Sequence, residues 1–180
     1  CVSIEDEVVH GIPGNNKLEE GQIVGIDVGS IYKGYYGDHA KSFPIGKINK
    51  NKENLLKVTK ECLEKGIKKA IPGNRIGDIG NAVQEWAENN GYGVVRELVG
   101  HGIGLKLHED PQIPNYGESG TGPRIEAGMC FAIEPMINMG AKEVYTKEDG
   151  WTICTKDGLP SAHFEHTIVV TKEGPQILTV

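Results

Sequence analysis

Long hydrophobic runs are missing from this sequence of 180 residues, in which 38% of the side chains are hydrophobic and 24% are charged. No apolar segment approaches the roughly 20 residues of a membrane span. No positively charged and then apolar leader precedes Cys1, and low-complexity segments and short-period repeats are missing too. The lack of a long apolar run excludes a membrane-spanning helix, and the composition predicts a soluble globular protein with a single domain over residues 1–180.

Cysteine is scarce as well. Cys1, Cys62, Cys130 and Cys154 lie far apart and form no Cys-x-x-Cys pair. The sequence therefore indicates neither a zinc knuckle nor a disulfide framework. Because chains without a disulfide framework fit a reducing compartment, we expect the protein in the cytoplasm.

Positive charge is in the minority, since 19 Lys and Arg stand against 25 Asp and Glu and give a net charge of -6. A surface that follows a phosphate backbone needs an excess of positive charge, so nucleic acid is not expected as the substrate. Part of the acidic excess is available to bind cations.

The spacing of the apolar residues predicts an α+β fold that is antiparallel in character. Helical spacing runs over residues 52–70 and stops at Pro72, and a second helix is expected from Arg75 to Asn90. We expect these helices to cover a sheet. Besides a hairpin near the N-terminus, strands are predicted at 92–99, 129–137, 150–155 and 163–171.

Asp27 and Asp38 lie in the two strand-like runs of that hairpin, Gln-Ile-Val-Gly-Ile-Asp-Val and Tyr-Gly-Asp-His-Ala. A turn centred between Tyr32 and Lys33 predicts that the two aspartates are direct cross-strand neighbours, with Cβ atoms roughly 4.5–5.5 Å apart. Two carboxylates so close repel each other unless a shared proton, a lysine or a metal ion lies between them.

Three more side chains favour the metal ion. His101 lies between glycines in Leu-Val-Gly-His-Gly-Ile-Gly, where the missing side chains let a ligand approach. Glu134 follows the apolar run Phe-Ala-Ile and precedes a proline, and Glu165 precedes a strand that is apolar on both faces. Carboxylates among apolar neighbours are costly to bury without a cation or hydrogen-bond donor beside them.

Each of these side chains has an ordinary interpretation when it is taken alone. A carboxylate in a strand more often faces solvent or pairs with Lys or Arg. The five positions together are the stronger argument, because five separate strand positions with oxygen or imidazole side chains rarely all lack a function. Two divalent cations would cancel the charge of the four carboxylates. The lack of thiolate ligands favours Mn, Fe, Co or Zn held by oxygen and nitrogen. Histidines that could equally be exposed or partly buried without a function are His10, His39, His108, His163 and His166.

These residues occur in sequence motifs whose order and spacing resemble those of the methionine aminopeptidases of the bacterial type, type I. The resemblance runs from one end of the sequence to the other. The motifs are Val-His-Gly-Ile-Pro at 9–13, Gly-Ile-Asp-Val at 25–28, Gly-Asp at 37–38, Gly-His-Gly-Ile-Gly at 100–104, His-Glu-Asp-Pro at 108–111, Ile-Glu-Pro-Met at 133–136, Asp-Gly-Trp at 149–151 and Phe-Glu-His-Thr at 164–167.

The resemblance implies a pita-bread fold of the creatinase/aminopeptidase kind and a dinuclear metallopeptidase catalytic domain. Such an enzyme removes the initiator methionine by attack of a metal-bridged hydroxide. By motif, Asp27 would bind one ion, and His101 and Glu134 would bind the other. Asp38 and Glu165 would bridge the two ions.

The resemblance also implies catalytic and substrate-binding roles. Glu134 would help to move the proton of the nucleophile, and His108 would donate a hydrogen bond to the scissile carbonyl oxygen. His10 would lie near the scissile nitrogen, and the free amine of the substrate would sit at the ion held by Asp27. Contacts with the substrate are expected from His10, His108, Cys1, Leu107 and Trp151.

The partners implied in this way are the N-termini of nascent polypeptides or short peptides, with the ribosome as a further candidate. A monomer without membrane association is expected.

The sequence departs from the family pattern in two respects. Family members carry roughly one further helical layer before the position of Cys1, so we expect an N-terminal segment to be missing and the first half of the fold, with part of the methionine pocket, to be incomplete. Ala132 stands where the family usually has Thr, and His163 where it usually has Gln, each two residues before a ligand. These changes alter the hydrogen bonds around the metal ligands.

Two alternatives remain open. A proline-specific aminopeptidase or dipeptidase of the same fold would share the five ligands, although the Val-His-Gly-Ile-Pro and Asp-Gly-Trp motifs favour the methionine type. A non-catalytic relative that binds a peptide or a ribosomal partner should have lost ligands, and all five are present.

Overall fold

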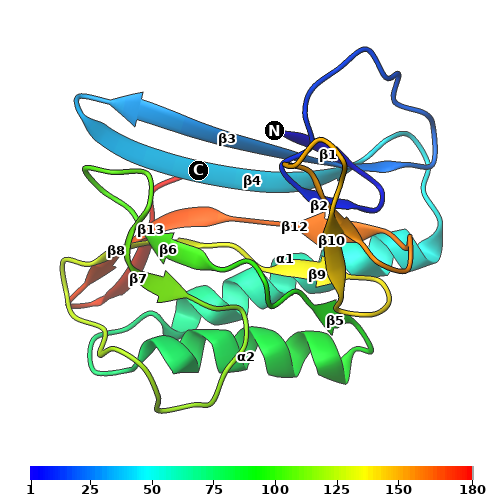
Figure 1. Ribbon diagram of the computed structural model, residues 1–180. Coiled ribbons are helices and arrows are strands. Elements are labelled where there is room, and N and C mark those ends of the chain that lie inside the picture. The colour runs from blue at the N-terminus through cyan, green and yellow to red at the C-terminus, as the bar shows by residue number, and fades with distance from the viewer. Residues whose placement is uncertain (180) are drawn as a thin grey trace.

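The computed structural model describes residues 1–179 and arranges them in layers, with helices on one side of the sheets and a long hairpin on the other (Figure 1). Every strand pair within the described residues is antiparallel. The predicted α+β class, with antiparallel sheet covered by helices, is therefore confirmed.

The strands pair into separate sheets. In spatial order across each sheet, the strands are β1 (Val2–Ile4), β3 (Ile23–Tyr32) and β4 (Tyr35–Pro44); β10 (Val144–Thr146), β11 (Ile153–Thr155) and β2 (Glu7–Val9); β12 (Ser161–His163), β9 (Met136–Asn138) and β5 (Gly93–Val94); and β14 (Gly174–Ile177), β13 (His166–Thr171), β8 (Cys130–Ile133), β6 (Gly100–Gly102) and β7 (Glu109–Ile113).

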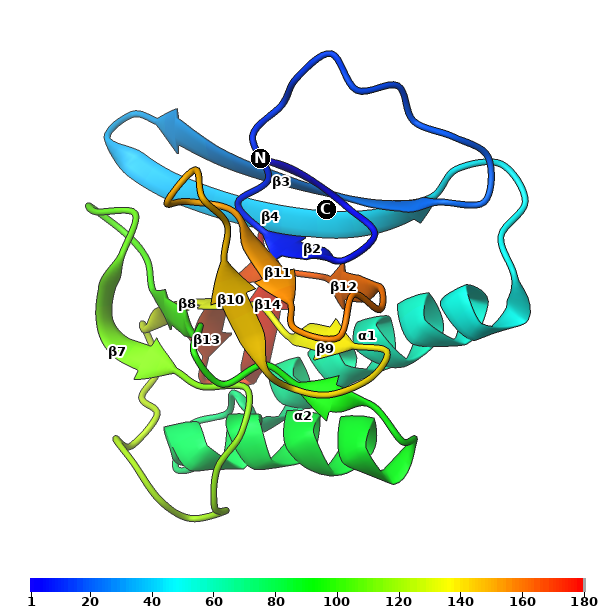
Figure 2. The same ribbon diagram turned by 45° about the vertical axis from the view of Figure 1, so that its right-hand side comes forward.

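The helices lie side by side beneath the sheets (Figures 1 and 2). The segments 52–70 and 75–90, predicted as helices, form α1 (Lys50–Lys69) and α2 (Ile76–Asn89), which confirms both predictions to within two residues at each end. The side chain of Asn49 caps α1 by accepting a hydrogen bond of 3.0 Å from a backbone N–H of the first turn.

The main core lies between the helices and the strands. Leu55 of α1, Val83 of α2 and Phe131 of β8 belong to this core and are fully buried. Burial of such side chains is the main favourable contribution to folding. Because β8 is fixed against the helices, the position of Glu134 directly after it is fixed as well.

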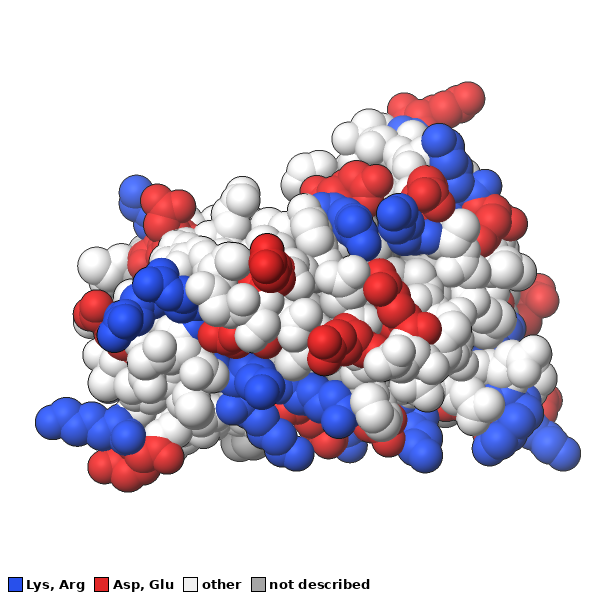
Figure 3. All heavy atoms as spheres, turned by 90° about the horizontal axis from the view of Figure 1, so that it is seen from below, with Lys and Arg blue, Asp and Glu red and all other residues white. Residues whose placement is uncertain are grey.

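The helical face of the molecule carries charges of both signs. Viewed from below, Lys and Arg side chains are interspersed with Asp and Glu side chains (Figure 3). Charge that is mixed in this way does not build the single-sign field that attracts a phosphate backbone. Neither helix of the described residues has the length and apolar character needed to cross a membrane.

Two predicted strands are interrupted where a carboxylate lies. Residues 129–137 form β8 and β9, and residues 163–171 form the end of β12 and β13, so the continuous strands expected there are wrong. At each break the chain passes between the β14-β13-β8-β6-β7 sheet and the β12-β9-β5 sheet. Glu134 and Glu165 occupy these two breaks, which brings them to the junction of the same two sheets.

Two other predicted strands are shorter than expected. Only Gly93–Val94 of the segment 92–99 forms a strand, and only Ile153–Thr155 of the segment 150–155 does so.

The predicted register of the N-terminal hairpin is also wrong. Tyr32 pairs with Tyr35, so the turn is centred on Lys33 and Gly34, which have φ angles of 50° and 85°. Two central residues with positive φ are typical of the tight turns whose twist matches a hairpin. Asp27 consequently pairs with Ala40, and Asp38 pairs with Gly29. The aspartates are diagonal neighbours on one face of the hairpin and do not lie directly opposite each other.

Candidate active site

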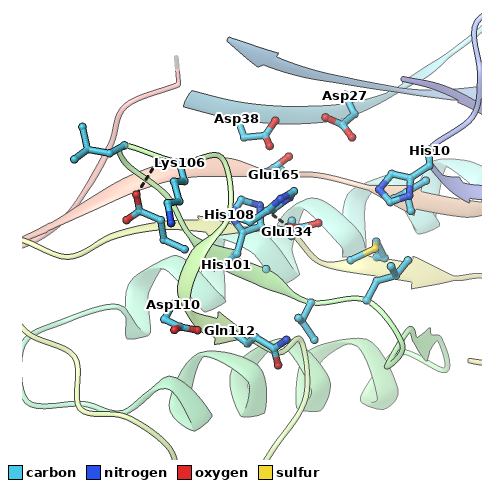
Figure 4. A pocket seen from close by; sticks show the side chains of 17 residues that line it. His10, Asp27, Asp38, His101, Lys106, His108, Asp110, Gln112, Glu134 and Glu165 are labelled. Carbon is cyan, nitrogen blue, oxygen red and sulfur yellow. Dashed lines mark hydrogen bonds and ion pairs between the residues drawn. The ribbon is translucent and has the colours of Figure 1, made fainter. Parts of the chain in front are cut away.

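A cavity of about 840 Å³ lies between the β3-β4 hairpin and the junction of the two sheets that carries Glu134 and Glu165 (Figure 4). It collects side chains from segments that are far apart in the sequence. The predicted site residues that line it are His10, Asp27, Asp38, His101, His108, Glu134 and Glu165.

The tightest group in this cavity consists of Asp38, His101 and Glu165. Each offers one ligand atom, and these three atoms lie within 4.8 Å of one another. The side chains come from β4, from β6 and from the break between β12 and β13. Their exposed fractions are only 8%, 8% and 2%. An imidazole and two carboxylates at this separation are a donor set that a divalent cation can bind.

Asp27 and Glu134 lie around this group. Asp27, half-buried on β3, points from the hairpin into the cavity beside Asp38 (Figure 4). Glu134 approaches from the opposite side, with its Oε1 atom 3.5 Å from Nε2 of His101. The structure thus brings all five predicted ligands to one cavity.

Electrostatic repulsion dominates the site. Burial raises the pKa of Glu165 well above its ordinary range, and the surrounding carboxylates raise it further. Burial likewise raises the pKa of Asp38, and the nearby carboxylates of Asp27 and Glu134 add to the shift. Like charges in a poorly hydrated place disfavour ionisation, whereas an opposite charge among them favours it.

The Oε1 atom of Glu165 is buried and has no hydrogen-bond partner among residues 1–179. A buried acceptor without a partner carries the full cost of its lost hydration. A cation in the group of Asp38, His101 and Glu165 would supply the missing partner. The donor set, its charge and its orphaned oxygen therefore fit a divalent metal ion.

Backbone contacts hold Asp38 and Glu165 next to each other although they lie 127 residues apart in the sequence. The Thr167 hydroxyl accepts a hydrogen bond of 2.8 Å from the Asp38 N–H and donates one of 2.8 Å to the Asp38 carbonyl oxygen. The Glu165 N–H donates to the carbonyl oxygen of Ala40 at 2.8 Å. These contacts join β4 to the segment that carries Glu165.

Thr167 is a residue that the sequence reasoning did not single out. A sequence signal was available, because Thr167 is a polar residue two positions after Glu165 and directly before the apolar run 168–170. The sequence pattern did not identify the Asp38 backbone as the hydrogen-bond partner of Thr167.

The predicted catalytic histidines, His10 and His108, lie at the rim of the group formed by Asp38, His101 and Glu165. The ring of His108 is exposed and meets the ring of His101 edge to face, with centroids 4.4 Å apart. His10 stacks on Trp151 with ring centroids 5.0 Å apart and 24° between the planes. Burial lowers the pKa of His10, which favours a neutral imidazole.

The remaining predicted substrate contacts do not line the cavity over the described residues. Cys1 and Trp151 are exposed, and Trp151 reaches the site only through the stack with His10. Leu107 lies in the loop beside the lining residue Lys106.

His39 and His166 stack on each other with centroids 4.8 Å apart and also lie outside the cavity lining. They are neighbours of the candidate ligands Asp38 and Glu165, as the sequence indicated.

Comparisons with known proteins agree with this geometry. The model of metallopeptidase family M24 matches residues 1–172. Methionine aminopeptidase 1 of Bacillus subtilis is 51% identical over 179 residues, which cover 99% of this chain and 72% of the relative. The crystal structure of methionine aminopeptidase from Thermotoga maritima superimposes with a TM-score of 0.97 at 52% identity and covers 99% of this chain and 72% of that one.

More distant structures share the fold with lower identity. Prolidase from Pyrococcus furiosus has a TM-score of 0.79 at 25% identity, and the match covers 99% of this chain and 48% of that one. The shared architecture confirms the predicted pita-bread fold, and the chain spans about 72% of the length of its methionine aminopeptidase relatives. Since a metallopeptidase model matches nearly the whole chain and half of the residues are identical to those of such relatives, the chain belongs to metallopeptidase family M24 and, within it, to the methionine aminopeptidases.

Proposed function

We propose that this protein is a metal-dependent aminopeptidase that removes the N-terminal methionine from nascent polypeptides and short peptides. The observation that carries the proposal is the convergence of Asp38, His101 and Glu165 within 4.8 Å, in a chain that is about half identical to methionine aminopeptidases over its whole length.

Two divalent ions of the Mn, Fe, Co or Zn class would be held by the five cavity residues. Asp27 would hold one ion, and His101 and Glu134 would hold the other. Asp38, on the hairpin, and Glu165, at the sheet junction, would contact both ions. Two such ions balance the charge of four carboxylates and, when bound, lower the pKa of a water molecule so that a nucleophile is available at neutral pH.

The side chains around the ions would handle the substrate and its protons. Glu134 would accept the proton of the attacking water and pass it to the leaving amine. His108, at the cavity mouth, would donate a hydrogen bond to the scissile carbonyl oxygen as that oxygen gains negative charge. His10 would lie near the scissile nitrogen, where its depressed pKa keeps the imidazole neutral.

The selectivity for an exposed N-terminus would come from the ion held by Asp27, to which the free amine of the substrate would bind. Asp27 lies at the hairpin side of the cavity (Figure 4), so the ion that it would hold lies on that side as well. Contacts with the methionine side chain are assigned to His10, Cys1, Leu107 and Trp151. The stack of Trp151 on His10 supports the inclusion of Trp151, because it ties an exposed aromatic ring to a residue of the cavity wall.

The likeness to prolidases makes a proline-specific peptidase the second candidate, but the identity drops from 52% to 25% between the two kinds of structure. A non-catalytic relative that binds peptides or the ribosome is less well supported, because all five candidate ligands line the cavity. We place the protein in the cytoplasm as a monomer that acts on newly made chains, with the ribosome as a candidate partner.

The test is the release of methionine from a Met-Ala-Ser peptide, compared with hydrolysis of an Ala-Pro dipeptide, which has no N-terminal methionine, in the presence of Mn²⁺ or Co²⁺. We expect free methionine from the first peptide and none after treatment with a chelator. Faster hydrolysis of the Pro-containing dipeptide would support the prolidase alternative. A protein that binds the ions and cleaves neither peptide would leave only the binding function.

A further inference from the structure

Besides the cavity-lining histidines His10, His101 and His108, a further imidazole approaches Glu134. His163, at the end of β12, is only 4% exposed, and its Nε2 atom lies 3.5 Å from Oε2 of Glu134. Nε2 is buried and has no hydrogen-bond partner within residues 1–179. A buried ring nitrogen without a partner is costly, so its orientation toward a carboxylate needs an explanation.

Glu134 lies between two imidazoles. Its Oε1 atom is 3.5 Å from Nε2 of His101, and its Oε2 atom is 3.5 Å from Nε2 of His163. The two rings come from different sheets, since β6 belongs to the β14-β13-β8-β6-β7 sheet and β12 to the β12-β9-β5 sheet. The carboxylate sits in the break between β8 and β9, where no strand ladder holds it. Its orientation therefore depends on side chains.

The backbone of His163 is held firmly. The Ser42 hydroxyl donates a hydrogen bond of 3.0 Å to the His163 carbonyl oxygen, and the His163 N–H donates one of 3.0 Å to the same hydroxyl. On the other side, His163 pairs with Met136, two residues after Glu134. The imidazole ring of His163 thus points toward Glu134 from a backbone that is held by β4 and by β9.

We propose that His163 is a positioning residue that donates a hydrogen bond from Nε2 to Oε2 of Glu134. This bond turns Oε1 toward His101, with which Glu134 would hold a cation, and it keeps the second oxygen in place for proton transfer. Hydrogen bonds to a metal ligand fix its orientation and tune its affinity for the metal. The inference rests on the proposed function, in which Glu134 is a ligand and a proton carrier.

Two amide variants and one apolar variant test this role. The side-chain nitrogen of Gln reaches about as far as Nε2 of histidine, whereas that of Asn reaches only as far as Nδ1. His163→Gln should therefore keep the bond, while His163→Asn and His163→Leu should lose it. Calorimetry measures the binding of Mn²⁺, and hydrolysis of a Met-Ala-Ser peptide gives kcat and KM. Thermal unfolding of the metal-free protein shows that each variant is folded.

We expect affinity for the Mn²⁺ assigned to His101 and Glu134 to fall about 10- to 100-fold in the Asn and Leu variants, with a lower kcat and a nearly unchanged KM. The Gln variant should stay within about threefold of the original protein. If the Asn variant, which retains a polar amide, binds Mn²⁺ and turns over like the Gln variant, His163 does not position Glu134.

The two proposals fail in different ways. Normal metal binding and methionine release in the original protein, with equal loss or no loss in the Gln and Asn variants, would overturn the role of His163 alone. A protein that binds no Mn²⁺ and releases no methionine would overturn the proposed function and this inference together.

Discussion

Thr167 and Asp38 are joined by two hydrogen bonds of 2.8 Å, in which the threonine hydroxyl accepts from the aspartate N–H and donates to the aspartate carbonyl oxygen. One side chain thus satisfies both backbone groups of a candidate metal ligand, as a neighbouring strand would. The contact fixes the hairpin that carries Asp27 and Asp38 against the strand that follows Glu165. The relative position of the candidate ligands Asp38 and Glu165 depends on this contact.

Replacing Thr167 with Val should destabilise the protein and loosen the metal site. The substitution keeps the shape but leaves the N–H and the carbonyl oxygen of Asp38 without partners, at a cost of about 1–3 kcal/mol for each buried group. Urea unfolding of the metal-free variant measures the loss, and calorimetry with Mn²⁺ measures the weaker binding. Thr167→Ser retains the hydroxyl and should recover most of both. Equal stability of the Val and Ser variants would contradict the role of the two bonds.

Replacing Glu134 with Gln should abolish most of the turnover. The amide cannot accept the proton of the attacking water, and it is a poorer ligand, so a fall of about 10²- to 10⁴-fold in kcat is expected with metal supplied. Peptide hydrolysis at saturating Mn²⁺ checks this. Glu109, which lines the same cavity and accepts a hydrogen bond from the Lys106 N–H, offers a matched control. Glu109→Gln should retain most of the activity, and near-normal turnover of Glu134→Gln would show the assignment of roles wrong.

Glu165 and Asp38 should contribute less to the stability of the metal-free protein as the pH rises. The pKa of Glu165 is raised above its ordinary value of 4.5, and that of Asp38 above 3.8. The folded state therefore keeps protons that the unfolded state has already released. The contribution of the protonated Glu165 and Asp38 to the free energy of unfolding is complete below their ordinary pKa values. It is lost as the pH rises through the raised pKa values.

Bound metal should reverse this trend, because it favours the ionised carboxylates. The difference in Tm between metal-loaded and chelator-treated protein should grow from about pH 5 to about pH 7.5. Thermal unfolding over this range measures it. The double variant Asp38→Asn, Glu165→Gln should show neither the pH trend nor the gain in Tm with metal. A difference that shrinks with rising pH would contradict the predicted sign.

Replacing Trp151 with Leu should weaken substrate binding while leaving the metal in place. The change removes the stack on His10, and an aromatic pair contributes about 0.5–1.5 kcal/mol beyond its buried area. We expect KM for a Met-Ala-Ser peptide to rise roughly two- to tenfold, with unchanged affinity for Mn²⁺. Trp86, which packs against the core and contacts Lys65, serves as the control. Trp86→Phe should leave KM unaltered, and an equal effect of both changes would argue against a specific role of the stack.

Local patterns in the sequence were sufficient to predict the helices and to select the candidate ligands that line the cavity. The segments 52–70 and 75–90 carry apolar residues at helical spacing, and this periodicity depends only on residues a few positions apart. The candidate ligands were recognised because acidic side chains stand in apolar surroundings, where they are costly without a partner. The order of the motifs around them was enough to indicate the family, which the comparisons confirm.

The register of the hairpin required the structure. The sequence offered a turn between Tyr32 and Lys33, whereas the chain turns at Lys33 and Gly34 because the tight turn needs positive φ at both positions. A shift of the turn by one residue moves the partner of Asp27 from Asp38 to Ala40. Both aspartates still face the cavity, since the shift in pairing is by two positions.

The sequence by itself determined which residue types this protein brings to its cavity, since burial cost and periodicity act on each short segment separately. Only the tertiary structure decided which of them meet. The breaks that hold Glu134 and Glu165, the contact of Thr167 with Asp38 and the approach of His163 to Glu134 arise where separate sheets join. Such contacts connect residues up to 129 positions apart, and no local pattern specifies them because they depend on how the whole core packs.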